Sequence, residues 1–385
     1  MFWPRRRRGT RSLLLCAVFT SAVVAFISDA FYGVYLAQVT GCSSGPDSRA
    51  TGEGHKHNIV DTPKVKGTLF VEPFHGLGNR LRAYASAAAL AKKSGRSLVV
   101  VWVPDVHIGA NFTDLFQVPS GVTVVHFPIL FYLMQNHDNL LVYDYNSKGG
   151  KDKILRDRSC SAIYVRSAYV LQSETKVVEA DIVEELKALM PVPSVTRRAT
   201  KGSAHLAGLK NIIGVHIRMQ TDIEMDVPGI SKLPAYHAAG ISSMGPVESY
   251  RSRCHYSEFI PRFEEALVAN RESVFLVATD SDEAVDALRT KYGRRVLTFQ
   301  GEPTNCSGIL ARGRSCVQEA LAQFLALSNL STSLMLSDWS SASELIRRLG
   351  SPTPYITGCA KEENHRCLPL SLACTLHRMK MTNWY

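Results

Sequence analysis

The chain has 385 residues, and its length, composition and charge exclude several classes of protein. Hydrophobic residues make up 45% of it and charged residues 20%, which excludes a chain that is disordered throughout and predicts a sizeable core in one or two domains. The formal net charge is +10, but no stripe of basic and aromatic residues is present, so we expect no nucleic-acid partner. This charge suits an anionic small molecule, and an ordinary basic surface is the alternative.

The N-terminus carries the signals of a secretory protein. Arg5–Arg8 precede an apolar stretch over residues 12–39, which Asp29 interrupts. Basic residues before such a stretch predict a cytoplasmic tail and signal anchor over residues 1–39, with the body in the lumen of the Golgi or ER as a single-pass type II protein. Ser28–Ala30 also fits a signal-peptidase site, so a secreted protein is the alternative.

The cysteines agree with that compartment. One of the nine, Cys16, lies in the apolar stretch, and the other eight lie in the body, an even number that predicts disulfides. Cys306 with Cys316, and the three cysteines from Cys359 onward, are plausible local partners, and the spacing leaves the connectivity open. No two CxxC pairs occur, so we expect no zinc site. Glycosylation sequons begin at Asn111, Asn305 and Asn329.

Residues 40–66 are rich in glycine, serine and charge without apolar periodicity, which predicts a stem linker. A first series of strands and helices then fills residues 67–195. Apolar residues at helical spacing that stop at Gly95 predict its first helix. The predicted elements are strands at Gly67–Val71, Leu98–Val103 and Val122–Phe127, and helices at Gly78–Ser94 and Val178–Met190.

A second series fills residues 196–358, and a boundary is expected within Pro193–Lys210. Its strands are predicted at Asn211–Arg218, Val274–Thr279, Val296–Phe299, Ser333–Leu336 and Tyr355–Thr357, and its helices at Glu258–Asn270, Glu283–Tyr292, Cys316–Ser328 and Ala342–Leu349. This alternation predicts an α/β fold of two Rossmann-like halves that face a cleft, each a parallel sheet covered on both faces. Residues 359–385 are expected to form a disulfide-tethered tail.

The first motif that suits a ligand is GLGNRLR, between a predicted strand and a predicted helix. Gly76 and Gly78 allow close approach of a ligand to the backbone, and the amides of a helix N-terminus favour an anion. Asn79 can donate and accept hydrogen bonds, while Arg80 and Arg82 add positive charge. The alternative is a tight turn with solvated arginines. The spacing is not GxGxxG, so a dinucleotide is not expected.

The second motif is GVHIR, at the start of the second series. Strand alternation places His216 and Arg218 on one face, at the strand end where ligands collect in open α/β sheets. The arginine fork suits a diphosphate, and the nearby acids Asp222, Glu224 and Asp226 could accept a proton from a hydroxyl. A salt-bridge cluster at the strand end is the alternative.

Two further strand ends carry polar groups. Asp280 and Asp282 follow a buried strand, where they could recognise a base or ribose, bind a metal as a DxD motif, or only cap the next helix. Ser340 and Ser341 precede the last helix, where hydroxyls and free amides suit an anion. Ser341 with Glu344 also forms a capping-box pattern, and both readings can hold at once.

Taken in order, GLGNRLR, HIR, VATDSDE and SDWSSASE resemble the fucosyltransferase superfamily, which includes α1,6-fucosyltransferases, rhizobial Nod-factor enzymes and protein O-fucosyltransferases. The resemblance covers residues 68–357. It implies a GT-B-like fold, GDP-fucose as the donor, a glycan or glycoprotein acceptor, inversion at the anomeric carbon, and no metal or other cofactor.

The resemblance also implies roles for particular residues. Arg218 would bind the diphosphate and stabilise the leaving GDP. Members of the α1,6 type usually have HxRRTDK, whereas Met219 and Gln220 follow the arginine here, so Asp222 falls one place later. The resemblance therefore assigns no general base. Glu224 and Asp226 are candidates by position. The residues expected near the donor are Gly76, Gly78, Asn79, Arg80, His216, Asp222, Asp280, Ser340 and Ser341.

Two other functions fit the same sequence. Asp280 and Asp282 could hold a metal for a UDP-sugar transferase, and loss of activity in chelator would favour this reading. A membrane-tethered pseudoenzyme could bind glycan without turnover, because a fold does not guarantee activity. The acceptor and its linkage are not encoded in any motif.

Overall fold

The computed structural model describes residues 67–145, 155–156, 161–219, 254–301, 306, 312–338 and 340–359. The predicted tail, anchor and stem over residues 1–66 lie outside this part of the chain, as does the C-terminal tail beyond Cys359. Within the described part, no helix is long and apolar enough to cross a membrane.

The N-terminal half is built on a five-stranded sheet, every pairing of which is parallel, with the strand order β3-β2-β1-β5-β4. The three predicted strands are present, and β4 and β5 are strands that the sequence analysis did not assign. The strands are β1 (Thr68–Pro73), β2 (Ser97–Val101), β3 (Val122–Val125), β4 (Leu140–Asp144) and β5 (Ala162–Ser167).

Four helices accompany this sheet: α2 (Leu77–Ser94), α3 (Phe112–Leu115), α4 (Leu130–Asn136) and α5 (Glu179–Ala188). Alanines fill the middle of α2 and all of them are buried, because small side chains let this helix pack closely on several neighbours. Gly95 ends α2 in the left-handed region, at φ 66°, as the sequence predicts.

The C-terminal half repeats this plan with the parallel order β10-β9-β6-β7-β8. Each predicted strand of this half is present, and each predicted helix is present within a few residues. The strands are β6 (Ile212–Ile217), β7 (Val274–Thr279), β8 (Val296–Thr298), β9 (Ser333–Leu336) and β10 (Tyr355–Thr357). The helices are α9 (Ile260–Ala269), α10 (Asp282–Tyr292), α11 (Arg314–Leu330) and α12 (Ser341–Gly350).

In each sheet the first strand lies in the middle, and the later strands add to both of its sides. The order therefore reverses between β1 and β5 in one sheet and between β6 and β9 in the other. In open α/β sheets, ligands bind outside the carboxyl ends of the strands at such a reversal. The two central strands are β1 and β6. GLGNRLR begins shortly after the end of β1, and HIR lies at the end of β6.

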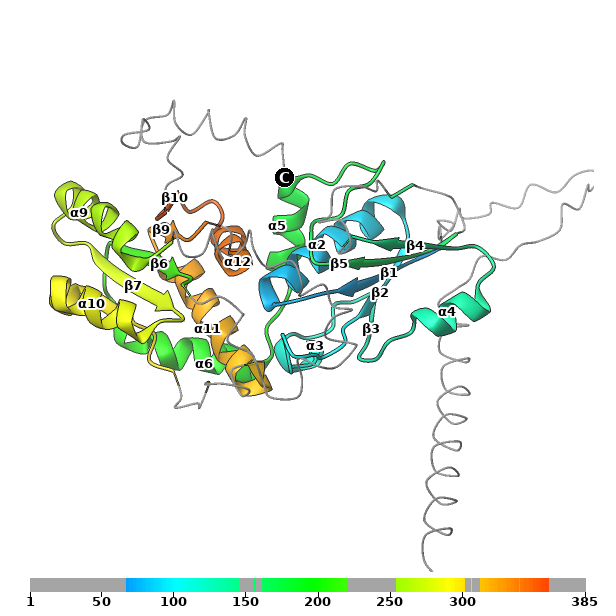
Figure 1. The fold of residues 1–385 in the computed structure, drawn as a ribbon, viewed down its shortest axis with the longest axis horizontal. Helices are drawn as coiled ribbons and strands as arrows, with labels where there is room; N and C mark the ends of the chain where they lie inside the picture. The colour runs from blue at the N-terminus through cyan, green and yellow to red at the C-terminus, as the bar shows by residue number, and fades with distance from the viewer. Residues whose placement is uncertain are drawn as a thin grey trace, which may run out of the picture.

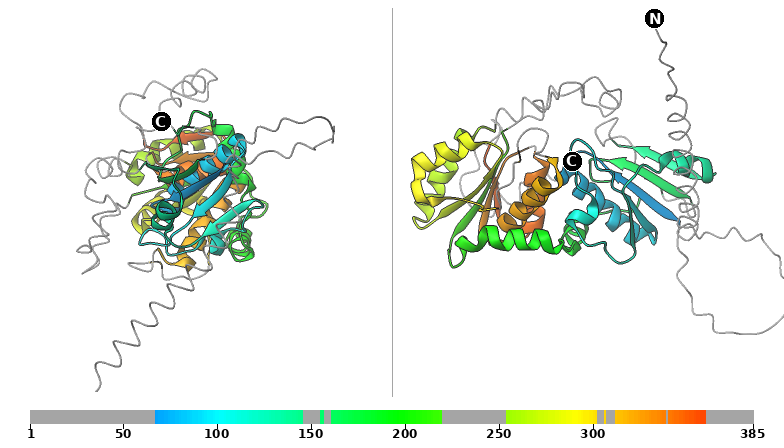
Figure 2. Two further views of the ribbon diagram at one scale, coloured as in Figure 1. Left: turned by 90° about the vertical axis from the view of Figure 1, so that its right-hand side faces the viewer. Right: turned by 90° about the horizontal axis from the view of Figure 1, so that it is seen from below.

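The two halves of the protein pack against each other through helices of both. Helix α6 (Pro193–Ser203) crosses the position where the sequence predicts a boundary, and it packs against α11. Figures 1 and 2 show α11 and α12 between the two sheets, beside α2. Side chains of α11 and α12 enter the core of the N-terminal half: Val317, Leu321, Ala322 and Leu345.

Two disulfides lie in the described part of the chain. Cys306 pairs with Cys316, as predicted. Cys359 pairs with Cys254, 105 residues earlier, rather than with a local partner. This correction has a structural reason: β10 ends beside the segment that leads into α9, so the two cysteines meet at the rim of the C-terminal sheet, with a Cα–Cα distance of 5.0 Å. Cys367 and Cys374 are outside the described residues.

Candidate functional site

The first turns of α2 and α12 touch each other. A Cβ added to Gly78 would lie 2.9 Å from the backbone nitrogen of Ala342 and closer still to the carbonyl of Ser341, so only glycine fits there. Each helix N-terminus carries about half a positive charge and several amides without intrahelical partners. Two such ends in contact favour a bound anion.

The carboxyl end of β6 delivers Arg218 to the same region. Its Nη1 lies 2.7 Å from Asp280 Oδ2, at the end of β7. Its backbone N–H donates to the Ser337 hydroxyl at 2.9 Å, at the end of β9. Asp280 also accepts from the N–H of Met219 at 2.8 Å. A guanidinium carries five N–H donors in a planar fork, which is the geometry that pairs with a carboxylate or a phosphate.

His216 lies one residue inside β6 and is 6% exposed. Its Nδ1 and the Ser343 hydroxyl share a hydrogen bond of 2.7 Å, and its ring packs edge-on against Phe324 of α11. Burial, with the positive charge of Arg218 as a second cause, lowers the pKa of His216 from 6.5 to about 3. His216 is therefore neutral near pH 7 and links β6 to the first turn of α12.

This pKa predicts a pH dependence of stability. Below about pH 6.5 the unfolded chain takes up a proton at His216 that the folded protein does not, so the free energy of unfolding falls as the pH drops. The free energy of unfolding falls by up to ~1.4 kcal/mol per pH unit.

Urea unfolding at pH 7.5 and 5.5 should show a smaller pH effect in His216→Gln than in the wild type. The exposed His205, changed to Gln, is the matched control and should retain the full effect. An equal pH effect in all three proteins would contradict the assignment.

Arg80 is buried between the loops that follow β1 and β2. It is 1% exposed, and its guanidinium donates to the carbonyls of His75 at 2.9 Å and Val103 at 2.7 Å. It also pairs with Asp105 at 2.9 Å and lies over the Trp102 ring at 5.1 Å. Arg80 therefore supports the loops after β1 and β2, and its place beside the donor stays a prediction.

The remaining predicted residues fall into three groups. Gly76 precedes α2 with open space around its Cα, and Asn79 is half-buried in the first turn of α2. Ser340 caps α12 by accepting from the N–H of Ser343 at 3.3 Å, beside Ser341. Three predicted acids lie outside the described residues: Glu224 and Asp226, the candidates for the general base, and Asp222, which is expected near the donor.

The DxD reading gains no geometric support. Asp280 faces Arg218 and the Met219 amide, Ser281 caps α10, and Asp282 is exposed at the start of that helix. Among the described residues, no group of three or more histidine, cysteine, aspartate or glutamate side chains is placed to hold a metal ion.

Three residues of the site lie within the predicted motifs, but the sequence does not predict their contacts. Ser337 holds the Arg218 backbone, Ser343 holds His216, and Arg82 reaches from α2 to Glu344 on α12 at 2.8 Å. The only signal for them was their place beside predicted site residues. We define the α12 cradle as residues 340–343 together with Arg218.

The contacts bring all four motifs together around the α12 cradle. Gly78 touches Ser341, His216 touches Ser343, and Arg218 is held from β7 and β9. Helix N-terminal amides, hydroxyls and one guanidinium at strand ends form an environment that suits a phosphate-bearing ligand.

No protein-family model matches the chain, and no curated protein matches its sequence. Solved structures are similar to it at low identity. The fucosyltransferase NodZ from Bradyrhizobium is 16% identical, with 73% of this chain and 91% of that chain covered and a TM-score of 0.46. POFUT1 in complex with GDP-fucose is 13% identical, with 77% and 99% covered and a TM-score of 0.46. An Arabidopsis thaliana FUT1 variant in complex with GDP is 15% identical, with 77% and 71% covered and a TM-score of 0.43.

Proposed function

We propose that the protein is a glycosyltransferase that transfers fucose from GDP-fucose to a glycan or glycoprotein acceptor, with inversion and without a metal or other cofactor. The observation that supports it best is the meeting of four motifs at the α12 cradle, in which Gly78 packs directly on Ser341. Capping alone does not require two helix N-termini to meet beside an arginine at a strand end. The choice of fucose and guanine rests on the resemblance of the motifs.

The proposed mechanism follows from charge. The acceptor oxygen forms a bond to the anomeric carbon while the bond from that carbon to the β-phosphate oxygen breaks. GDP leaves with the electron pair, and the hydroxyl proton passes to a base. Negative charge grows on the β-phosphate as GDP departs, so Arg218 and the amides of α12 stabilise the transition state more than the ground state.

We place the body of the protein in the lumen of the secretory pathway, held at the Golgi or ER membrane through residues 12–39. The basic flank before that stretch supports this proposal. Two disulfides in the body also support it, because disulfides persist in oxidising compartments. Release of the body by cleavage is the alternative outcome, and sizing the mature N-terminus by mass spectrometry would decide between them.

Thermal unfolding of the full-length protein with nucleotides tests the proposal. A ligand that binds only the folded state adds ~2.7 kcal/mol at about 100 times its Kd. We expect GDP to raise the Tm with or without manganese, and UDP to have little effect. Stabilisation by UDP only with manganese would support the metal-dependent UDP-sugar transferase instead. No response to either nucleotide would support a glycan-binding pseudoenzyme.

A further inference from the structure

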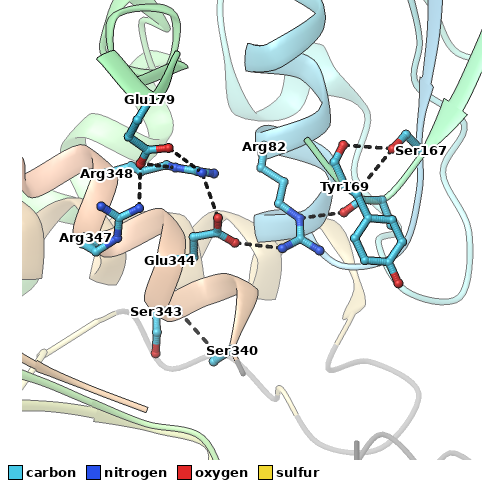
Figure 3. A network of polar contacts seen from close by, with 10 residues as sticks. Arg82, Ser167, Tyr169, Glu179, Ser340, Ser343, Glu344, Arg347 and Arg348 are labelled. Carbon is cyan, nitrogen blue, oxygen red and sulfur yellow. Dashed lines mark hydrogen bonds and ion pairs between the residues drawn. The ribbon is translucent and has the colours of Figure 1, made fainter. Parts of the chain in front are cut away.

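Arg82 joins the two halves of the protein beside the α12 cradle. It lies on α2, where its Nη1 donates to Glu344 Oε2 at 2.8 Å and its Nε donates to the carbonyl of Ala168 at 2.6 Å. Its guanidinium also lies 5.1 Å from the ring centre of Tyr169, just beyond β5. Figure 3 shows this side chain between α2, the segment after β5, and α12.

The ion pairs continue along α12 to α5. Glu344 Oε1 lies 2.9 Å from Arg348 Nη2, and Arg348 makes two contacts of 2.9 Å with Glu179. Arg347 also donates to Glu179 at 2.6 Å. Helix α12 follows β9 in the C-terminal sheet, yet these contacts hold it from α2 and α5 of the N-terminal half (Figure 3).

Glu344 places a negative charge beside the α12 cradle, where an anion would bind. Burial alone would raise the pKa of its carboxyl, but Arg348 and Arg82 outweigh burial and hold that pKa below its usual range. The carboxylate therefore stays charged in the first turn of α12, one residue from the cradle. An uncompensated carboxylate there would repel a diphosphate, because both occupy the positive end of the same helix dipole.

We infer that Arg82 is a positioning residue for the α12 cradle: from the N-terminal half, it fixes the first turn of α12 and offsets the charge of Glu344. This inference rests on the proposed function, since it concerns the same donor site. It assigns the placement of the donor diphosphate to a contact between the two halves, and not to the C-terminal sheet alone. Arg82 itself need not touch the donor.

The chain offers a matched control on the same helix. Lys92 of α2 pairs with Glu184 of α5 at 2.7 Å, where both side chains are about two-thirds exposed, and more weakly with Glu185 of α5 at 3.4 Å. Exposed pairs of this kind contribute little to stability. Lys92→Met therefore removes an ion pair between α2 and α5 without touching α12.

Two measurements on the full-length protein test the inference. The first is the Kd for GDP by calorimetry. We expect Arg82→Ala to weaken binding by about 10-fold, which corresponds to ~1.4 kcal/mol of binding free energy. Arg82→Lys should fall between, because lysine keeps the charge without the fork. Adding Glu344→Gln to Arg82→Ala should restore part of the affinity, and Lys92→Met should bind like the wild type.

The second measurement is amide hydrogen exchange without ligand. Arg82→Ala or Arg82→Lys should speed exchange of the Ser343 and Glu344 amides, which donate to Ser340 at the start of α12. The Ala284 amide, which donates to Ser281 at the start of α10, should exchange unchanged. If both Arg82 variants match Lys92→Met in exchange, the positioning role is wrong whether or not GDP binds. A wild type that does not bind GDP would reject the proposed function, while the exchange result would still decide the role of Arg82.

Discussion

We expect Arg218→Ala to lower the rate of the proposed fucose transfer by ~10²-fold or more while the protein stays folded, because a donor that acts on transition-state charge is worth roughly 3–4 kcal/mol. Arg218 stands at the end of β6, held by Ser337 through its backbone and by Asp280 through its guanidinium. Removing the side chain leaves the backbone contact intact. Steady-state kinetics with GDP-fucose should show that kcat and kcat/KM fall together, the sign of an interaction made in the transition state.

The control for this result is an arginine of the same half without a place in the site. Arg262 pairs with Glu265 on α9 at 2.9 Å, and Arg262→Ala should leave kcat unchanged. Arg218→Lys should recover only part of the rate, because a point charge does not replace a fork that reaches two oxygens. Near-normal turnover in Arg218→Ala would remove this residue from the mechanism.

Gly78→Ala is the second variant with a large expected effect. Its new Cβ would meet the Ser341 carbonyl and the Ala342 nitrogen, which are backbone atoms that cannot rotate away. The first turns of α2 and α12 would have to separate. We expect the free energy of unfolding to fall by at least the ~1–3 kcal/mol typical of overpacking, and GDP to bind more weakly. Urea unfolding and a GDP titration measure the two effects.

Gly76→Ala is the matched control, two residues earlier. Gly76 has φ −69°, which any residue adopts, and a Cβ there would meet nothing within 4 Å. Gly76→Ala should lower the free energy of unfolding by less than ~1 kcal/mol, the scale of a changed helix N-cap. If the two alanine variants behave alike, the close approach of α2 and α12 is wrong.

The sequence predicts most of the C-terminal half, because its strands are continuous apolar runs followed by polar groups and amphipathic helices. It does not predict β5, although Ile163–Val165 form such a run, because an apolar run this short does not distinguish a strand from other buried segments. It also assigns no helix to the segment after Pro193, where it expects the boundary between the halves, whereas proline in the first turn starts α6 there.

The candidate site is predictable as a set of motifs and not as a set of contacts. Periodicity places His216 and Arg218 at a strand end, but it cannot show that His216 is buried against Ser343. Burial of Arg80 depends on Trp102 and Asp105, which lie in another loop. These contacts join segments far apart in the chain, so only the packed structure shows them.

The central claim is that the protein moves fucose from GDP-fucose, and a transfer assay tests it most directly. Purified full-length protein would be incubated with labelled GDP-fucose and a mixture of glycoproteins and oligosaccharides, in the presence of chelator. We expect label to enter an acceptor with the wild type and at least ~10²-fold more slowly with Arg218→Ala. No incorporation by the wild type in chelator, with incorporation restored by manganese and a UDP-sugar, would contradict the account.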